Sequence, residues 1–406
     1  MSRQRPIYGV IITGCILLFS LFLLLSVFRP PVVPDEGPPT VYLLYASAGT
    51  MPQLLITDQI DAFITWEPVV SNAELSGIGT IIATPADLPP PGKWENAAIN
   101  VLVLRKDVIE QYPDISALLS ALTTAAINRT NEDPEPAREI TADWVFGTEP
   151  ILTPVGSIDP LDVENSSFGY MNFTANAEIP ESGIVNQVLN GDTNSTYNPE
   201  DMVNPVVSMR GNQFLNGSAI PRLTGDIPTI NIGYIPSSDN YAPLYVMVKE
   251  SGYFCDQYGF CLAPDDPEAS RPVECTLFVQ GAPAAHINLI PGQSGGGIMT
   301  TIGQKSLQGA YVGAVPAELQ IALGNPSSII QSINTGGSGL VVSNEVDCKN
   351  WDSFVAWVKL FHKADKPPLV IATVQSSIQE DMIREALAYE NISVILYGTD
   401  FETEYP

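Results

Sequence analysis

The chain has 406 residues, enough for two lobes or domains, and it carries 45 acidic against 18 basic residues for a formal net charge of −27. Because such a surface repels polyanions, the composition argues against nucleic acid and against an anionic membrane surface as binding partners. The 35 prolines indicate many loops.

The N-terminal apolar segment is the clearest single feature of the sequence. Ile7–Phe28 contains no charged residue, is long enough to span a bilayer, and follows Arg3 and Arg5. We therefore expect a single-pass anchor at 7–28 in the cell membrane, with residues 1–6 in the cytoplasm and the C-terminal domain outside the cell. A cleaved signal peptide is the alternative, but the apolar run is long and no Ala-x-Ala site follows it. The proline-rich residues 29–39 predict a semi-rigid stalk.

Short apolar segments alternate with polar turns in the next part of the chain. Val41–Tyr45 is a strand candidate, and residues 51–59 are a brief helix candidate. The run Ile60–Val69 reads as a strand that ends at Trp66-Glu67-Pro68. Asn100–Leu104 is almost continuously apolar, as in a sheet covered on both faces. A helical apolar stripe from Ile115 to Ile127 starts just after Pro113 and predicts a buried helix.

The middle of the chain is polar and weakly periodic. Residues 150–225 are rich in Asn, Ser, Gly, Pro and Thr, and residues 190–226 read as a linker. In an exported segment, clustered Asn-x-Ser/Thr patterns suggest glycosylation. The four candidate acceptors in this region are Asn165, Asn172, Asn194 and Asn216.

The segment from Ile230 has the order strand, polar turn, helix. Ile230, Ile232 and Tyr234 alternate as in a strand, Pro236–Asn240 form a polar turn, and Pro243 fits the first turn of a helix. Such a junction in an open α/β sheet offers a binding crevice. A strand–helix unit without a ligand would read much the same.

Further along, three more junctions have the same character. Ala310–Pro316 ends a strand, and Asn334–Ser338 is a turn before another strand. Ser377 with Glu380 is a capping-box pattern that predicts a helix start. The Gly-rich turn Gly295–Gly297 lacks a Lys-Ser/Thr pair, so it is not a Walker phosphate loop.

These segments resemble substrate-binding proteins of ABC importers, of the nitrate/taurine/sulfonate and thiamine-pyrimidine type. The resemblance is carried by Gly233–Phe254, by the Ile-Asp-Ala-Phe strand at Ile60–Phe63 leading into Trp66-Glu67-Pro68, and by Ala310–Ala317. It implies an α/β fold of the two-lobed periplasmic-binding-protein-like (type II) class, with mixed, mainly parallel sheets and helices on both faces. The lobes would close over a ligand by a hinge.

The two halves of the family pattern stand in reversed order. Residues 230–400 match its first half and residues 40–190 its second, so the resemblance implies a circularly permuted chain joined at 190–226. Two unrelated half-domains are the alternative. In the permuted arrangement, lobe 2 would comprise residues 40–104 and 346–406, and lobe 1 residues 105–189 and 227–345.

Two segments compete for one strand position. Val394–Tyr397 and Val41–Leu44 both resemble the strand before the Ile-Asp-Ala-Phe segment. One of them would be an added edge strand, or it would pair with a neighbouring molecule by strand exchange, giving self-association.

The resemblance also implies a set of ligand-binding residues at strand ends and helix starts. These residues are Ser237, Asp239, Asn240, Tyr241, Gly313, Ala314, Asn334, Ser338, Ser376, Ser377 and Gln379, with Trp66 and Glu67 from the facing lobe. Because these stretches hold no lysine or arginine and Glu67 would repel a dianion, we expect a neutral, zwitterionic or cationic-headed ligand.

The sequence shows no arrangement typical of an enzyme. His286 and His362 have neither metal-ligand spacing nor an evident nucleophile partner, and no Gly-x-Ser-x-Gly elbow occurs. We therefore expect no catalytic residue, no metal and no cofactor.

Four cysteines in the exported part predict disulfides. Three pairings are possible, and we favour Cys255 with Cys261 and Cys275 with Cys348.

The function implied by the resemblance is delivery of a small-molecule ligand to an ABC permease and its ATPase. The alternative is a surface-structural or adhesion protein that kept the fold without transport. Permutation, glycosylation patterns and strand duplication favour the alternative, and the set of cleft residues favours transport.

Overall fold

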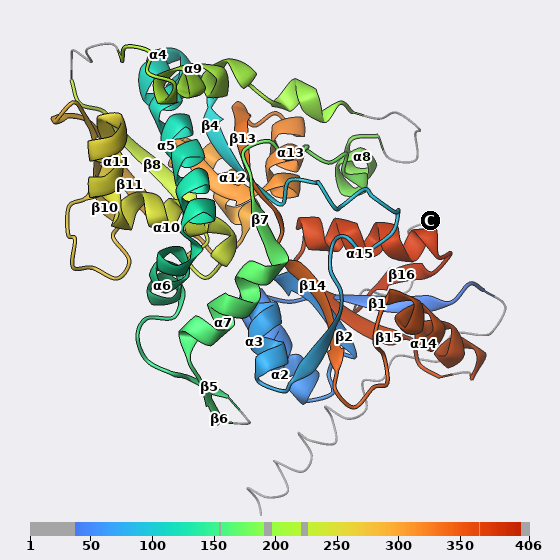
Figure 1. Cartoon of the computed structure of the whole chain (residues 1–406). Helices are drawn as coiled ribbons and strands as arrows, with labels where there is room; N and C mark the ends of the chain where they lie inside the picture. The colour runs from blue at the N-terminus through green and yellow to red at the C-terminus, as the bar shows by residue number, and fades with distance from the viewer. Residues whose placement is uncertain (1–36, 154–155, 191–196, 221–225, 365, 399–406) are drawn as a thin grey trace, which may run out of the picture.

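Two large β-sheets form the framework of the protein (Figure 1). The structure is a computed structural model, and it describes residues 37–153, 156–190, 197–220, 226–364 and 366–398. One sheet has six strands and the other eight, and β5 (Ile151–Thr153) and β6 (Gly156–Ile158) form a separate hairpin. The expected mixed α/β architecture with two sheets is confirmed.

The six-stranded sheet is mainly parallel and covered on both faces. Its strands, in spatial order, are β16 (Ser393–Leu396), β1 (Thr40–Tyr45), β15 (Leu369–Thr373), β2 (Ala62–Trp66), β14 (Ser338–Ser343) and β3 (Gly79–Ala83). Only β14 runs antiparallel to its neighbours.

The alternation along β2 explains how both faces of this sheet are buried. Ala62 and Ile64 join the core beneath α14 (Trp351–Lys363) and α15 (Ile378–Tyr389). Phe63, on the other face, packs with buried residues of α2 (Met51–Ile56) and α3 (Val69–Leu75).

The eight-stranded sheet is mixed, and five of its seven strand pairings are antiparallel, so the expectation of mainly parallel sheets is wrong for this lobe. Its strands, in spatial order, are β7 (Met171–Phe173), β13 (Ser327–Gly336), β4 (Asn100–Arg105), β12 (Gly309–Gly313), β8 (Thr229–Tyr234), β11 (Ala282–Pro291), β10 (Glu274–Val279) and β9 (Phe260–Pro264). Here β8 lies parallel to β11 and β12, whereas β4 is inserted antiparallel between β12 and β13.

Most of the remaining helices belong to the lobe of the eight-stranded sheet. They are α4 (Lys106–Gln111), α5 (Pro113–Glu132), α6 (Pro134–Val145), α9 (Pro205–Leu215), α10 (Ala242–Lys249), α11 (Ser251–Tyr258), α12 (Gly295–Gly303) and α13 (Ala314–Ala322). The apolar stripe predicted for 115–127 is the buried face of α5, which packs against α9 and α10.

Two helices and four 3₁₀ turns complete the described elements. Helix α7 (Pro160–Ser167) contacts α3 and α6, and α8 (Gly183–Asn190) contacts α13 and α15. The 3₁₀ turns are η1 (Ala48–Thr50), η2 (Phe168–Tyr170), η3 (Pro199–Met202) and η4 (Asp239–Tyr241). Both α7 and α8 therefore join the two lobes.

The two halves of the sequence are interleaved in space. The six-stranded sheet combines β1, β2 and β3 with β14, β15 and β16, and β4 from the first half is central in the eight-stranded sheet. The predicted lobe boundaries are wrong for two strands. The range 40–104 assigned β4 to lobe 2, but β4 lies in the eight-stranded sheet; the range 227–345 assigned β14 to lobe 1, but β14 lies in the six-stranded sheet. The reason is that the chain crosses between sheets just before β4 and between β13 and β14.

The segments that compete for one strand position occupy neighbouring places. Strand β1 pairs with β15, and β16 pairs with the outer side of β1. Strand β16 is thus an edge strand that pairs within the same chain.

The region expected to be a linker is partly helical. Residues 190–226 include α9, whose buried Val207 and Phe214 join the main core beside α5. Asn165, Asn172 and Asn216 are exposed. The described residues do not include Asn194, the expected cytoplasmic tail at 1–6, the expected anchor at 7–28 or the first residues of the expected stalk. Among the helices that the structure does describe, none has the length and apolar character needed to cross a bilayer.

One of the two favoured disulfides is present. Cys255 and Cys261 are bonded, joining α11 to β9. The pairing of Cys275 with Cys348 is wrong, because Cys275 lies in the core of the eight-stranded sheet and Cys348 in that of the six-stranded sheet. Both are buried free thiols.

Candidate functional site

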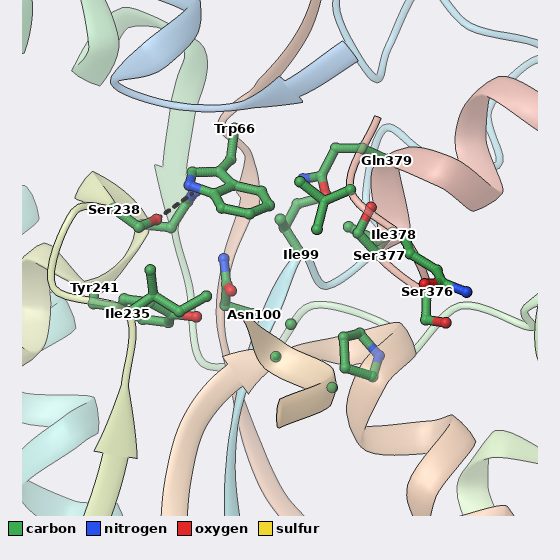
Figure 2. A pocket seen from close by; sticks show the side chains of 17 residues that line it. Trp66, Ile99, Asn100, Ile235, Ser238, Tyr241, Ser376, Ser377, Ile378 and Gln379 are labelled. Atoms are coloured by element: carbon green, nitrogen blue, oxygen red, sulfur yellow. Dashed lines mark hydrogen bonds between the residues drawn. The ribbon is translucent and has the colours of Figure 1, made fainter. Parts of the chain in front are cut away.

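A pocket lies where the two sheets meet, and both lobes line it (Figure 2). The centre of a water molecule can reach about 30 Å³ of it, and the total empty volume of about 450 Å³ includes open solvent. We call it the cleft pocket. The side of the six-stranded sheet contributes Trp66, Val374, Gln375, Ser376, Ser377, Ile378 and Gln379, and the other side contributes Ile99, Asn100, Ile235, Ser238, Asn240, Tyr241, Gly295, Gly296, Gly313 and Pro316. None of these side chains is charged at neutral pH.

The loop after β8 forms one wall. Because Pro243 fits the first turn of α10, the chain turns from strand to helix within a few residues. The buried Tyr245 hydroxyl on α10 donates to the carbonyl of Ser238 at 2.8 Å and so holds the loop against the helix. Ser238, Asn240 and Tyr241 are thereby held at the pocket.

Three buried asparagine side chains connect this wall to the crossings between the sheets. The amide nitrogen of Asn100 donates to Asn334 Oδ1 at 3.1 Å, and the amide nitrogen of Asn334 donates to Asn240 Oδ1 at 2.6 Å. Asn240 in turn donates to Ser238 Oγ at 3.3 Å and to the Gly337 carbonyl at 3.4 Å. We call Asn100, Asn334 and Asn240 the amide chain.

The start of α15 forms the opposite wall. Ser377 caps the helix by accepting from the Glu380 backbone N–H at 3.1 Å, as the capping-box pattern predicted. The Glu380 carboxylate accepts from the Ser376 N–H at 2.6 Å and from Arg384 at 2.7 Å, which holds Ser376 at its left-handed φ of 56°. Gln379 donates to Ser338 Oγ at 2.8 Å and so ties α15 to β14.

Three helix N-termini converge on the pocket. Besides α15, the first residues of α12 and of α13 line it. Gly295 permits this approach, since a Cβ there would lie 2.8 Å from Pro316 Cγ at the start of α13. The first N–H groups of a helix have no intrahelical acceptor, which gives each helix start a positive partial charge. Three of these groups are already bonded, since Gly297, Ala314 and Glu380 donate to Ser294, Ile99 and Ser377.

The structure brings together seven of the thirteen residues expected to bind ligand. Those lining the pocket are Trp66, Asn240, Tyr241, Gly313, Ser376, Ser377 and Gln379. Asn334 and Ser338 lie behind the wall, hydrogen-bonded to lining residues. Ala314 is fully buried, and Ser237 is exposed away from the pocket.

Several lining residues were not expected from the sequence. Asn100 looked like the start of an apolar strand, and only the pairing of β4 with β13 brings it beside Asn334. Gly295 and Gly296 were visible as a glycine-rich turn, which was a usable signal for close approach of a helix start.

Glu67 and Asp239 do not line the pocket. Together with Glu164 of α7 they form a cluster of carboxyl groups, all with 0% exposure, which we call the hinge acid cluster. Glu67 accepts from the Ser71 N–H at 2.9 Å and from its hydroxyl at 3.0 Å, and Ser167 donates to Asp239. The cluster joins the lobes, because the Asp239 N–H donates to the Glu67 carbonyl at 3.4 Å.

Burial dominates the electrostatics of this cluster. It raises the pKa of Glu67 to about 7, against the lowering effect of the Ser71 hydrogen bonds. Burial likewise raises the pKa of Asp239 to about 8, and burial followed by the charge of Asp239 raises the pKa of Glu164 well above its usual value. Within the described residues, no group of His, Cys, Asp or Glu side chains has the arrangement of a metal site.

Comparison with known proteins agrees with this architecture. The model of the NMT1-like family, part of the nitrate/sulfonate/taurine-binding periplasmic family, matches residues 40–145 and 225–403, which is more than half of the chain. The match leaves out the region that contains α7, α8 and α9. A search of curated proteins finds no match.

The raised pKa of Glu67 predicts how stability depends on pH. The folded state favours the protonated form of Glu67. The folded protein therefore has the full stabilising contribution of this proton below the unfolded pKa near 4.5, and loses the contribution as the pH rises through about 7. Glu67→Gln should remove this loss, which amounts to about 3 kcal/mol between pH 5 and pH 9. Urea unfolding across that range measures the slope of stability against pH.

A matched control is Glu139→Gln, which removes an exposed carboxylate of α6. It should leave the slope unchanged. A Glu67→Gln variant with the wild-type slope would contradict the assignment.

Proposed function

Since the chain belongs to the NMT1-like family, we propose that it is a solute-binding protein that holds a small molecule in the cleft pocket and delivers it to an ABC permease and its ATPase. The observation that carries the proposal is the uncharged pocket lined from both lobes. A ligand there contacts both sheets at once, so binding favours closure of the lobes. The protein holds its ligand and does not convert it.

The lining residues define the chemistry of the ligand. Helix N-termini and the amides of Asn100 and Gln379 supply donors, and the Trp66 indole N–H is buried without an acceptor among the described residues. The rings of Trp66 and Tyr241 supply apolar walls. We propose a compact molecule with acceptor atoms at one end and an apolar face, either uncharged or carrying one negative charge. Repulsion by Glu67 plays no direct part, because Glu67 faces away from the pocket.

Trp66→Ala should weaken ligand binding by about 1–3 kcal/mol, because the half-buried ring forms one wall of the pocket. The ligand is first found by a thermal-shift screen with nitrate, sulfonates, amino acids and pyrimidines, and its affinity is then measured by calorimetry. Ser237→Ala is the control, since Ser237 is exposed and lies outside the pocket. A ligand that binds both variants equally well would place the binding site elsewhere. A chain that binds nothing in the screen would favour the structural or adhesive alternative.

We also propose that the chain is a circular permutant. The support is the position of β1, which pairs in parallel with β15 at Val41↔Leu369, where a strand following α15 would ordinarily lie. The strand that does follow α15, β16, is displaced outward by one position. Strand β4 from the first half lies between β12 and β13 in the sheet that contains β8.

The permutation can be reversed experimentally. Thr40 is paired with Ser393, so Ile392 can be joined to residue 40 through one or two glycines. A chain that runs from 227 to 392 and then from 40 to 220 should fold cooperatively, with the near-UV circular dichroism of the natural order. A matched chain in which a glycine–serine sequence replaces β1 should not fold cooperatively. If the reordered chain is unfolded while the natural order is folded, the proposal is wrong.

We propose further that residues 7–28 anchor the protein in the cell membrane, with the binding domain outside the cell on the stalk of residues 29–39. The support is the uncharged apolar run behind Arg3 and Arg5 and the Cys255–Cys261 disulfide, which fits an oxidising compartment. The exposed Asn165, Asn172 and Asn216 are available for glycosylation there.

The anchor predicts that the intact chain stays in the membrane pellet after carbonate extraction and that external protease degrades its binding domain. A variant with Leu18→Arg and Leu23→Arg should lose this behaviour, because two charges in the apolar run make insertion costly by about 5–7 kcal/mol. A soluble chain beginning near residue 30 would show a cleaved signal peptide instead.

A further inference from the structure

Helix α8 bridges the two lobes beside the cleft pocket. It contacts α13, which starts at the pocket from the lobe of the eight-stranded sheet, and α15, which starts at the pocket from the other lobe. Figure 1 shows α8 standing next to both helices. Any separation of α13 from α15 must therefore break the contacts of α8 with one of them.

Specific hydrogen bonds hold α8 to both sides. The Ile184 N–H donates to Asp381 Oδ1 on α15 at 3.1 Å. On the other side, the Tyr197 hydroxyl donates to Glu318 on α13, accepts from the Ser182 N–H at 2.8 Å, and thus closes a link from α8 to α13. The approach is close: a Cβ on Gly183 would lie 3.3 Å from Asp381 Oδ1.

The two acids at the ends of these links, Glu318 and Asp381, are buried with incomplete hydrogen bonding. Glu318 has 0% and Asp381 1% exposure, and each has one carboxyl oxygen without a hydrogen-bond partner among the described residues. A buried carboxylate normally fills its acceptor positions, so an ionised Glu318 or Asp381 would be poorly compensated at this junction.

The surrounding charges do not compensate the pair. Lys93 is the nearby cation, but it is bonded to Glu385 on α15 at 2.6 Å. Helix α8 carries no charged side chain, and Glu200 and Asp201 of η3, which also packs on α13, are exposed. Two ionised acids at this junction would therefore add net negative charge between the lobes.

Burial is the main cause of a raised pKa for both acids. The pKa of Glu318 is raised to about 8 despite the Tyr197 hydrogen bond, and the pKa of Asp381 to about 7, with the charge of Glu385 adding to the effect. Both groups return toward their ordinary pKa values once the lobes part and water enters. Closure thus takes up protons, and it weakens as the pH rises through 7 and 8.

We propose that α8 and Tyr197 form a clasp that holds α13 to α15 across the cleft while Glu318 and Asp381 are protonated, and that releases the lobes when both acids ionise. The inference rests on the proposed function in one respect, namely that the lobes part to admit a solute. Capture of the solute is then favoured at acidic pH, and its release at alkaline pH.

The test measures the separation of the lobes without ligand, so its result does not depend on which solute binds. Spin labels are placed at Met209→Cys on α9 and Leu360→Cys on α14, both more than 60% exposed, in the full chain in detergent with Cys15→Ser. Electron–electron double resonance then records the distance distribution from pH 5 to pH 9. We expect one short distance at pH 5, and an open-to-closed ratio that rises by up to tenfold per pH unit for each proton released.

Three variants distinguish opening caused by ionisation of the clasp from general effects of pH on the distance between the lobes. Glu318→Gln with Asp381→Asn should keep the short distance up to pH 9, because neither side chain can ionise. Tyr197→Phe should shift the opening to lower pH, and Tyr112→Phe, a tyrosine outside the clasp, should behave as the parent. If the double variant does not fold, Glu318→Gln alone should roughly halve the logarithmic slope. A distance that does not change with pH in the parent, or that changes equally in the charge-free variant, would overturn the proposal.

Discussion

The amide chain of Asn100, Asn334 and Asn240 is the interaction on which the arrangement of the two lobes depends. Asn100 opens β4 where the polypeptide returns from the six-stranded sheet, and Asn334 lies near the end of β13 where it leaves. Both crossings are therefore fixed to the loop after β8 through buried amides. Such groups are costly to bury unless each finds a partner, so the three side chains specify one relative position of the crossings.

Gly337 completes this junction. It has a φ of 69°, and a Cβ there would lie 2.2 Å from Asn240 Oδ1, so only glycine allows the backbone to pass the amide chain. The wall of the cleft pocket that contains Asn240 and Tyr241 rests on this crossing. The pocket is thus a consequence of how the chain passes between the sheets, and its polar lining is positioned by the same hydrogen bonds that join the lobes.

The uncharged pocket lies between two sites where carboxyl groups are buried between the lobes. One is the hinge acid cluster of Glu67, Glu164 and Asp239, and the other is the pair of Glu318 and Asp381. In a chain with a net charge of −27, most acids remain in water, and these five lack a basic partner in direct contact among the described residues. Their burial is compatible with folding because protonation removes the charge, which makes the contact between the lobes sensitive to pH.

Local patterns in the sequence determined the elements and many of the cleft residues. Alternation and apolar runs located β1, β2, β4 and β8, the stripe after Pro113 located α5, and Ser377 with Glu380 marked the start of α15. The near neighbours Cys255 and Cys261 were paired correctly as well. These features depend on residues a few positions apart, whose interactions are set by the periods of helix and strand and by capping.

Only the tertiary structure decided which of these residues face the pocket. Glu67 and Asp239 belong to cleft segments but turn into a buried cluster, Asn100 enters the wall through pairing with a strand more than 200 residues away, and Cys275 and Cys348 lie in separate cores. The bridge made by α8 depends in the same way on contacts with helices that follow it by well over a hundred residues. Sequence spacing fixes the direction of a side chain within its own element, but the neighbour that it meets depends on how the two sheets are placed by packing and by the amide chain.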